Sequence, residues 1–322
     1  TSNQQGGIGR YFLAGGSLVS GELDMGFNSY PNVSSSAFEQ SGGYHTNGSG
    51  IYIDNSHYKL SGGVLNSSSM ILSGGEVSQS GGTNELGTLT MIFNSKSRYT
   101  FSGGQLDTDR AEINDGTFGD YGGTAKIRFL SLANGVWNEG SSGQQLGALR
   151  LGAGHSFINL SNPACILTFA DSSSLSWNAD GLLVIQNWSG SLYGGGLNRV
   201  IFGGSSVSLT RQQVGQLRFE DPAGLVPGTY PARILATGEI VPDTGEQLLP
   251  RIEVSLAATE LSVRLRIEGD IGANYGIEAS ADLSHWVIWT NEVNATGTLL
   301  LQDSARTNLQ QCFYRAVLIS PR

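Results

Sequence analysis

One recurring phrase of eight residues constrains the fold of this chain more than any other feature of its sequence. In each copy an apolar residue stands four positions before a Gly-Gly pair, and a serine usually comes directly before the pair. Successive regular copies are separated by 20, 19, 22 and 19 residues, measured between Gly42, Gly62, Gly81, Gly103 and Gly122. A repeat of this length is typical of a solenoid, in which each coil buries its apolar face only by stacking on its neighbours.

The spacing inside the phrase predicts strands and not helices. Apolar side chains recur four and two positions before the first glycine, which is the period of a strand. The Gly-Gly pair then supplies a corner where the backbone can adopt positive φ. We therefore predict an all-β fold, a β-helix (β-solenoid) with coils of about 20 residues. The residues at the fixed apolar position are expected to form an internal ladder: Tyr11, Phe38, Tyr58, Met70, Val77, Tyr99 and Phe118.

Composition excludes several other classes of protein. The 322 residues include 46 glycines and 8 prolines and are 14% charged, which is too little charge for a disordered chain and too little proline for collagen. A formal net charge of −9 disfavours a nucleic-acid partner or an anionic membrane surface, because both bind clustered Lys and Arg. No apolar run approaches the roughly 18 residues of a membrane-spanning helix, so we expect no membrane span.

The chain is expected to divide into two domains. The Ser-Gly-Gly phrase fades after Gly123, but the rhythm of strands and corners persists, so less regular coils should continue and give a solenoid over residues 1–245. A short amphipathic helix is expected within residues 209–219. The acidic connector at 242–250 begins and ends with proline and predicts a boundary. Six alternating runs beyond it predict a small β-sandwich over 246–322, with Trp286 and Tyr314 as core anchors.

The densest group of acidic residues is the candidate site for chemistry. Alternate residues of a strand share a face, so Asp107 and Asp109 would present two carboxylates together. Such a pair suits calcium, the one cofactor that the sequence suggests, or, with Arg110, a polysaccharide lyase or hydrolase. The alternative is that this acidic stretch, which extends to Asp120, is simply a solvated face of the coil.

No set of catalytic residues is visible, so we expect the protein not to be an enzyme. The sequence contains no Gly-x-Ser-x-Gly elbow, and the Gly194–Gly196 triplet is not followed by the lysine of a phosphate loop. The two cysteines, Cys165 and Cys312, lie in apolar strand-like runs and are expected to be buried free thiols, the alternative being a disulfide that ties the two halves of the chain together. The histidines lack metal-binding spacing and are interpreted as surface or corner residues: His45, His57, His155 and His285.

Several phrases together resemble a known family. The Ser-Gly-Gly coils are followed by Asn-Trp-Ser-Gly-Ser at 187–191, by three glycines before Ile-Phe-Gly at 201–203, and by Ala-x-Ile-Leu-Ala-Thr-Gly-Glu-Ile-Val-Pro at 232–242. Over roughly residues 10–242 the chain is similar to secreted bacterial proteins with autotransporter-associated β-strand repeats, the group often linked to PEP-CTERM sorting tails. Residues 275–286 and Phe313-Tyr314-Arg315 resemble a small C-terminal β-domain of such secreted proteins. The resemblance implies an exported structural or adhesive β-helix protein with no catalytic residues to carry over.

Three functions follow as expectations. We favour a non-enzymatic extracellular or cell-surface structural protein that binds other copies of itself head to tail, because only about ten polar residues precede the first repeat at Tyr11. A carbohydrate-binding adhesin, with extracellular polysaccharide as partner, would need exposed aromatic residues such as Tyr44, Tyr52 and Tyr193 along one face. A β-helical lyase or hydrolase would need a groove around Asp107 and Asp109.

Overall fold

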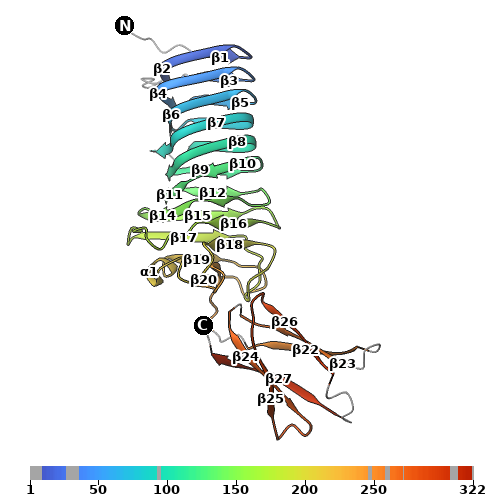
Figure 1. The fold of residues 1–322 in the computed structure, drawn as a ribbon. Helices are drawn as coiled ribbons and strands as arrows, with labels where there is room; N and C mark the ends of the chain where they lie inside the picture. The colour runs from blue at the N-terminus through green and yellow to red at the C-terminus, as the bar shows by residue number, and fades with distance from the viewer. Residues whose placement is uncertain are drawn as a thin grey trace.

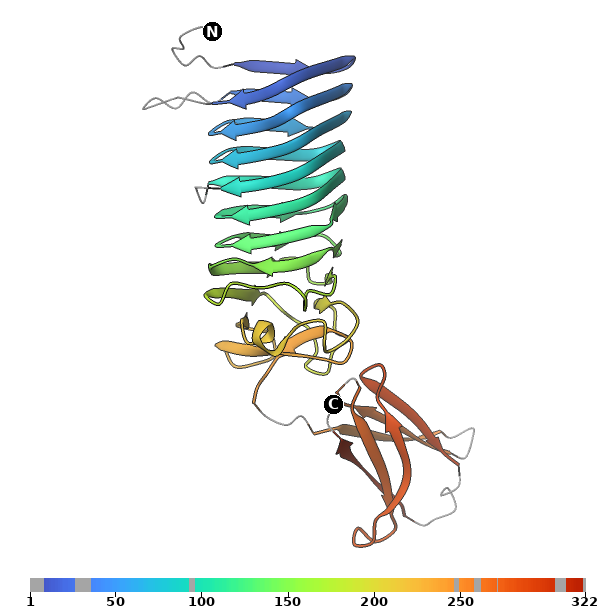
Figure 2. The same ribbon diagram turned by 60° about the vertical axis from the view of Figure 1, so that its left-hand side comes forward.

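The computed structural model describes residues 9–26, 36–92, 96–245, 249–257, 262–270, 272–304 and 311–320. It is almost entirely β-structure, with 62% strand and 1% helix, which confirms the predicted fold class. A tall column of stacked strands is followed by a smaller unit of antiparallel strands (Figure 1). The turned view in Figure 2 shows the strands of successive coils lying one below another along the column.

One wall of the solenoid runs along the whole column and contains the strand that precedes each glycine corner. Neighbouring strands within this wall all pair in parallel. In chain order these strands are β1 (Arg10–Leu13), β3 (Ala37–Gln40), β5 (His57–Leu60), β7 (Glu76–Ile92), β8 (Ser97–Asn114), β9 (Gly116–Asp120), β12 (Val136–Glu139), β15 (Gly154–Leu160), β17 (Gly181–Gln186) and β19 (Leu217–Glu220).

Two further walls complete each coil, because the strands after the glycine corner bend once more before the chain returns. The long strands β7 and β8 pass through the bend and contribute to more than one wall. The other strands of these walls are β2 (Ser17–Met25), β4 (Tyr44–Asp54), β6 (Val64–Ser73), β10 (Thr124–Ile127), β11 (Phe129–Ala133), β13 (Gln145–Leu146), β14 (Ala148–Leu151), β16 (Ile166–Phe169) and β18 (Arg199–Phe202).

The internal ladder of the first wall is confirmed, with one exception. Tyr11, Phe38, Tyr58, Val77, Tyr99 and Phe118 are register partners in succession, and the ladder continues through Trp137, Ile158, Ile185 and Phe219. The rings of Phe38 and Tyr58 stack with centroids 4.7 Å apart, and those of Phe118 and Trp137 at 4.5 Å. The prediction for Met70 was wrong: it pairs with Ile51 and Leu89 on another wall, because its glycine pair lies outside the 20-residue spacing.

The glycine corners are required by the stacking itself. Gly63 has φ of +79°, and a Cβ atom there would lie 2.4 Å from the carbonyl oxygen of Gly43 in the preceding coil. Gly82 and Gly104 meet the carbonyl oxygens of Gly63 and Gly82 in the same way, at 2.6 and 2.3 Å. Only glycine combines this left-handed backbone with such a close approach. The repeated sequence phrase is therefore a direct consequence of coil-on-coil contact.

The parallel stacking ends at β19, where the chain reverses direction. Strand β20 (Thr229–Ile234) pairs antiparallel with β19, and β21 (Glu239–Pro242) pairs antiparallel with both β20 and β18. The expected short helix is present as α1 (Arg211–Val214), and Thr210 and Gln213 form a capping box at its start. The C-terminal end of the solenoid is thus covered by antiparallel strands instead of another coil.

The C-terminal residues form two three-stranded antiparallel sheets. One sheet has the order β22 (Arg251–Ala257), β23 (Ser262–Glu268), β26 (Thr298–Asp303), and the other β25 (Val287–Val293), β24 (Asn274–Ser280), β27 (Phe313–Ser320). Leu265 and Ile267 of the first sheet share a core with Tyr275 and Ile277 of the second. Tyr314 packs on this core as expected, but the same expectation for Trp286 was wrong. Trp286 is half-buried outside the core, and the guanidinium of Arg315 lies 4.3 Å from its ring centroid.

An ion pair joins the solenoid to these sheets. Arg233 of β20 donates to both carboxylate oxygens of Asp270, at 3.0 Å each, and to the carbonyl oxygen of Leu192 at 2.6 Å. The hydroxyl of Tyr193 donates to the carbonyl oxygen of Leu249 at 3.1 Å. Bidentate Arg–carboxylate pairs are geometrically specific, so these contacts fix the orientation of the junction.

Candidate functional site

The first coil has an open face among the described residues. Within the described ranges, strand β1 pairs only with β3 and β2 only with β4, so no described strand lies on their N-terminal side. The glycines show the same asymmetry: a Cβ on Gly42 would lie 2.3 Å from the carbonyl oxygen of Ala14, whereas one on Gly15 would meet nothing within 4 Å. In each later coil this N-terminal side is covered by the preceding coil, whereas among the described residues nothing covers it in the first coil.

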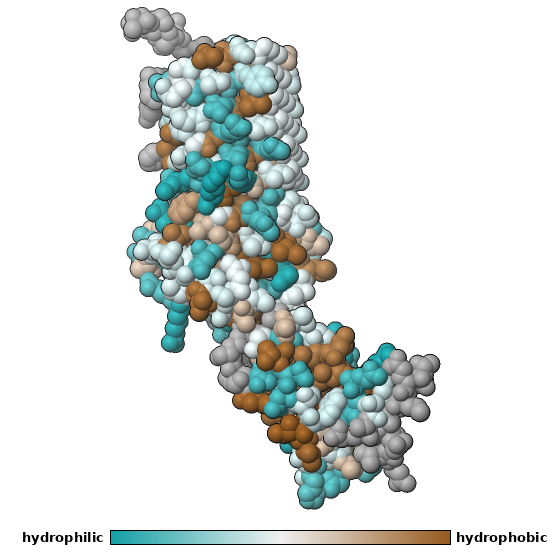
Figure 3. Space-filling view, in the orientation of Figure 1, coloured by the Kyte–Doolittle hydropathy of each residue, from teal (hydrophilic) through white to brown (hydrophobic). Residues whose placement is uncertain are grey.

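This open coil also carries apolar side chains where the next coils carry polar ones. Phe12 is 62% exposed and Val19 is 79% exposed. The register partner of Phe12 is Glu39, and that of Val19 is Thr46. Tyr11 ends the internal ladder and is 44% exposed, with its ring stacked on Phe38 at 4.8 Å. Hydrophobic surface is visible at this end of the column in Figure 3. Exposed apolar surface beside unpaired strands is typical of an interaction surface.

The candidate acidic pair lies in an open polar groove where the strands bend from one wall to the next. The groove has a volume of about 590 Å³ and includes Asn47, Asn66, Glu85, Asp107 and Asp109. Asn66, Glu85 and Asp107 are register partners in successive coils, and the Asn66 amide donates to Glu85 at 2.8 Å. The groove is thus a ladder of hydrogen-bonding side chains along the solenoid axis.

Both candidate carboxylates face cations from the next coil. Arg128 pairs with Asp107 and also with Asp109, in the latter case at 3.0 Å, and Lys126 lies 3.4 Å from Asp107. These contacts show that the two aspartates share a face, and the hydrogen bond from Arg128 is the main cause that lowers the pKa of Asp107. No group of three or more His, Cys, Asp or Glu residues among those described is arranged to hold a metal ion. Calcium binding by Asp107 and Asp109 remains a prediction, with both carboxylates already engaged.

The contacts of Asp107 make it a poor general acid. A carboxyl with a lowered pKa stays ionised and is a poor general acid at neutral pH. Arg110, the third residue of the suggested catalytic set, pairs with Glu112 at 3.0 Å, and its guanidinium lies 4.7 Å from the ring centroid of Phe129. Arg110 is therefore engaged with neighbours other than Asp107 and Asp109.

The three candidate sugar-stacking tyrosines do not form a row. Tyr44 is 61% exposed, whereas Tyr52 and Tyr193 are half-buried. Tyr44 pairs with Ser17 and Val64, and Tyr52 pairs with Asp24 and Ile71, so the two belong to different ladders. Tyr193 lies near the junction with the C-terminal sheets. The aromatic platform that an adhesin of this kind would use is not built from these residues.

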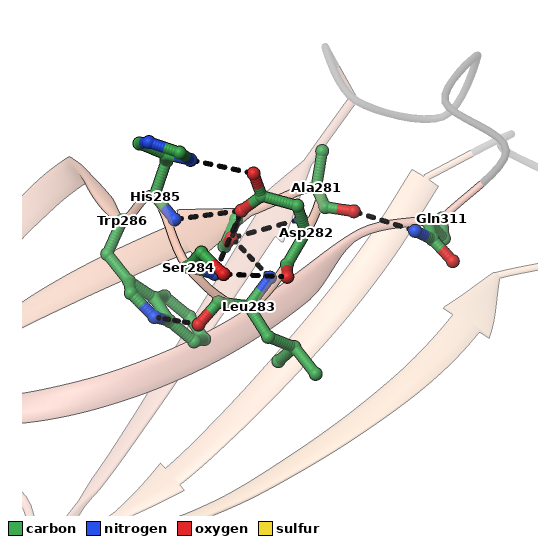
Figure 4. Close-up of polar contacts among 8 residues, drawn as sticks. Ala281, Asp282, Leu283, Ser284, His285, Trp286 and Gln311 are labelled. Atoms are coloured by element: carbon green, nitrogen blue, oxygen red, sulfur yellow. Dashed lines mark hydrogen bonds and ion pairs between the residues drawn. The ribbon is translucent and has the colours of Figure 1, made fainter.

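A tight turn after β24 gathers the polar contacts shown in Figure 4. Asp282 accepts hydrogen bonds from the backbone N–H groups of Ser284 at 2.9 Å and His285 at 2.8 Å, and its other oxygen lies 2.7 Å from Nδ1 of His285. Trp286 Nε1 donates to the carbonyl oxygen of Leu283 at 3.0 Å. The hydrogen bonds from His285 and Ser284 lower the pKa of Asp282, and the bond between the Asp282 carboxylate and the His285 imidazole raises the pKa of His285. The carboxylate is fully used in holding the turn, which supports a structural role.

Two predictions about isolated side chains need correction. His45 is completely buried and not a surface residue, and its imidazole lies 3.1 Å from the hydroxyl of Tyr58. Both cysteines are free, as expected, but Cys312 is half-buried while Cys165 is fully buried. Cys312 borders a cavity of about 290 Å³ with Asp282 and His285, and its Sγ contacts the carbonyl oxygen of Phe313 at 3.9 Å.

Sequence reasoning missed the polar groups inside the solenoid. Gln40 accepts a hydrogen bond from Tyr58 at 2.9 Å, and Gln79 accepts one from Tyr99 at 2.6 Å, with all four side chains buried. Asp120, which the sequence placed in a solvated acidic stretch, is also completely buried. Aligning the coils would have found these residues, because each stands two positions after a member of the internal ladder.

No protein-family model, curated protein or solved structure matches this chain. Among the described residues there is no helix with the length and apolar character needed to cross a bilayer. The β-solenoid supports the architectural part of the resemblance to autotransporter-associated repeat proteins. Membership in that family, and the export that it implies, are proposals.

Proposed function

We propose that this chain is a non-enzymatic structural protein of the cell exterior that assembles head to tail through its open first coil. The observation that carries the proposal is that β1 and β2, each with one strand neighbour among the described residues, also carry the exposed side chains of Phe12 and Val19. Export and surface location rest on the resemblance to secreted repeat proteins. The absence of a visible catalytic set in the sequence supports a non-enzymatic role.

The C-terminal sheets provide the complementary surface in this proposal. Strands β22 and β26 are the edges of one sheet, and β25 and β27 are the edges of the other. Addition of an edge strand to β1 or β2 of another copy would satisfy backbone groups and cover the apolar side chains of the first coil. The two surfaces differ, so the contact is heterologous and propagates into a filament unless its rotation closes a ring.

The test compares charge substitutions at the open coil with matched substitutions elsewhere. Lysine on an edge strand opposes strand addition, so Phe12→Lys with Val19→Lys should abolish concentration-dependent assembly. Val207→Lys with Val226→Lys is the control, because these valines are 73% and 76% exposed but lie away from the first coil. Light scattering and electron microscopy measure the outcome. A wild-type protein that stays monomeric at all concentrations contradicts the proposal.

Binding of extracellular polysaccharide is the second candidate, and the polar groove favours it over the tyrosines. Asn66, Glu85 and Asp107 repeat along the axis at the spacing of paired strands, about 4.8 Å, and offer donors and acceptors to a hydroxyl-rich chain. Glycan-array binding that is lost in Asn66→Ala and retained in Tyr44→Ala would support this function. Glycan binding that is lost in Tyr44→Ala but retained in Asn66→Ala would instead indicate that the glycan binds at Tyr44.

A further inference from the structure

A second column of interior positions runs beside the aromatic ladder. Its members stand two residues after those of the ladder and are also register partners: Leu13, Gln40, Leu60, Gln79, Phe101, Asp120, Glu139 and Leu160. The two glutamines have partners on both sides of the amide, since Gln40 also donates to the carbonyl oxygen of Val64 at 2.9 Å and Gln79 to that of Gln105 at 2.7 Å. The column thus tolerates polar groups when they are neutral and hydrogen-bonded.

Asp120 and Glu139 break this pattern, because they place two carboxyl groups next to each other in the interior. They are direct register partners in β9 and β12, whose backbones are spaced by about 4.8 Å. Both side chains are 0% exposed. Phe101 and Leu160 are their register partners on the two outer sides, so apolar side chains close the column above and below the pair.

The hydrogen bonds distinguish the two carboxyl groups. Glu139 accepts from Nε1 of Trp137 at 3.1 Å and from the backbone N–H of Ser141 at 3.1 Å, and also from the Ser141 hydroxyl. Asp120 accepts at Oδ1 from the N–H of Gly122, at 3.2 Å, whereas its buried Oδ2 has no partner. The donors to Glu139 oppose the burial that raises its pKa, whereas Asp120 has an oxygen suited to carry a proton.

No cation compensates the pair among the groups that interact with it. Gln144 is a neutral neighbour that lowers the pKa of Asp120, and its amide donates to the carbonyl oxygen of Gly123 at 3.3 Å. Among the described residues, Cys165 is the one other titratable group that interacts with both acids. Burial and the charges of Glu139 and Asp120 raise its pKa to about 12, so its thiol stays neutral. Lys126 and Arg128, the nearest cations in sequence, pair with Asp107 on the outer surface instead. Two uncompensated buried carboxylates at this spacing would repel each other strongly.

We propose that Asp120 and Glu139 share one proton in the native solenoid, and that loss of this proton loosens the coils that contain β9 and β12. The pair is then a pH-sensitive element built into the core, independent of any assembly through the first coil. In the protonated state Asp120 Oδ2 donates toward the ionised Glu139, and this satisfies the one oxygen without a partner. In the deprotonated state two like charges face each other without water.

The direction of the pH dependence follows from linkage. Burial and the charge of Glu139 raise the pKa of Asp120 to about 7, from an ordinary value of 3.8. The folded chain therefore binds more protons at Asp120 than the unfolded chain between these values, so the stability contributed by Asp120 is fully present below pH 3.8 and is lost as the pH rises to about 7. One proton changes the unfolding equilibrium constant by up to about tenfold per pH unit in this window. Above the folded pKa this contribution is flat.

The experiment measures unfolding of the full chain in denaturant from pH 4.5 to 8.5. Wild type should lose stability across the window, whereas Asp120→Asn, which is neutral at every pH, should have a shallower slope because only Glu139 keeps a pKa raised by burial. Asp109→Asn is the matched control, because Asp109 is an outward-facing aspartate whose side chain is 73% exposed, and it should keep the wild-type slope. Hydrogen exchange, corrected for its intrinsic pH dependence, should locate the loosening at β9 and β12.

A second variant and a second measurement keep the proposal open to contradiction. If Asp120→Asn does not fold, Glu139→Gln should reduce the slope instead, since Asp120 stays buried but loses its charged neighbour. Infrared spectroscopy should detect a protonated carboxyl band near pH 6 in wild type that is missing from Asp120→Asn. A wild-type profile without a slope, a slope that is unchanged in both neutral variants, or the absence of that band would each overturn the proposal.

Discussion

The solenoid and the C-terminal sheets solve the same problem of burying one face of a strand in different ways. In the solenoid each residue packs against its counterpart about 20 positions away, so Tyr58 contacts Phe38 and the same chemistry is repeated down the column. In the C-terminal sheets the partners are antiparallel and their separation changes at every position, as Ile277 pairs with both Thr290 and Ala316. Repetition makes the requirements of the solenoid visible in its sequence, whereas those of the C-terminal sheets are particular to each residue.

The largest effect should come from the glycine corner, where the solenoid differs most from an ordinary sheet. Gly63→Ala adds a Cβ 2.4 Å from the Gly43 carbonyl oxygen at a φ of +79°, and we expect a loss of more than about 3 kcal/mol in unfolding free energy. Gly16→Ala at the equivalent position of the first coil, where φ is +75° but a Cβ would meet nothing within 4 Å, should cost only about 1–2 kcal/mol for the left-handed backbone. Chemical denaturation measures both variants. Equal losses would show that the corner requires glycine for a reason other than stacking.

The next effect concerns the buried hydrogen bonds beside the ladder. Tyr99→Phe removes a hydroxyl that donates to Gln79 at 2.6 Å and accepts from Asn84 at 2.8 Å. Both partners stay buried without their bonds, so a loss of about 1–3 kcal/mol is expected. Tyr121→Phe serves as the control, because this tyrosine is 49% exposed. A Tyr99→Phe variant as stable as wild type would mean that the core relaxes around the missing oxygen.

The junction between the two regions should show a smaller and more local effect. Arg233→Ala removes the bidentate pair with Asp270, and we expect the contact to be weakened by roughly 1–2 kcal/mol because both side chains are partly exposed. Small-angle scattering should then show a wider range of orientations, while the solenoid itself stays folded. Arg251→Ala, which removes an exposed pair with Glu253, should leave the scattering curve unchanged. A larger change in the scattering curve for Arg251→Ala than for Arg233→Ala would contradict the role of the Arg233–Asp270 pair in orienting the junction.

The smallest effect is expected at the turn in Figure 4. Hydrogen bonding to Asp282 raises the pKa of His285, so its NMR titration midpoint should lie above 6.5 and should fall in Asp282→Asn. The attraction is present while His285 is protonated and disappears as the pH rises through its folded pKa. Asp171→Asn, which alters a similar turn stabilised by Ser173 in the solenoid, should leave this midpoint unchanged. An unshifted His285 in wild type would show that the side chain does not hold the described contact.

Sequence reasoning succeeded for residues that follow the 20-residue repeat and was less certain for residues outside it. Phe38, Tyr58 and Tyr99 were predicted correctly because strand alternation and the coil length together fix which residues face inward. Met70 was misplaced because a second wall has its own glycine corner. Trp286 was misplaced because an aromatic residue in a short sandwich strand or turn can face either way, and the cation of Arg315 retains it at the surface.

The sequence by itself determined that this protein is a β-solenoid with coils of about 20 residues, since the glycine spacing and the alternation of apolar residues are local properties of the chain. It also placed Asp107 and Asp109 on one face, because that follows from alternation alone. Only the tertiary structure decided what each acid meets. Arg128 reaches Asp107 from the next coil, whereas Asp120 faces Glu139 inside the core. The reason is physical: the charge of a carboxyl group depends on burial and on neighbours that stacking, and not sequence proximity, brings together.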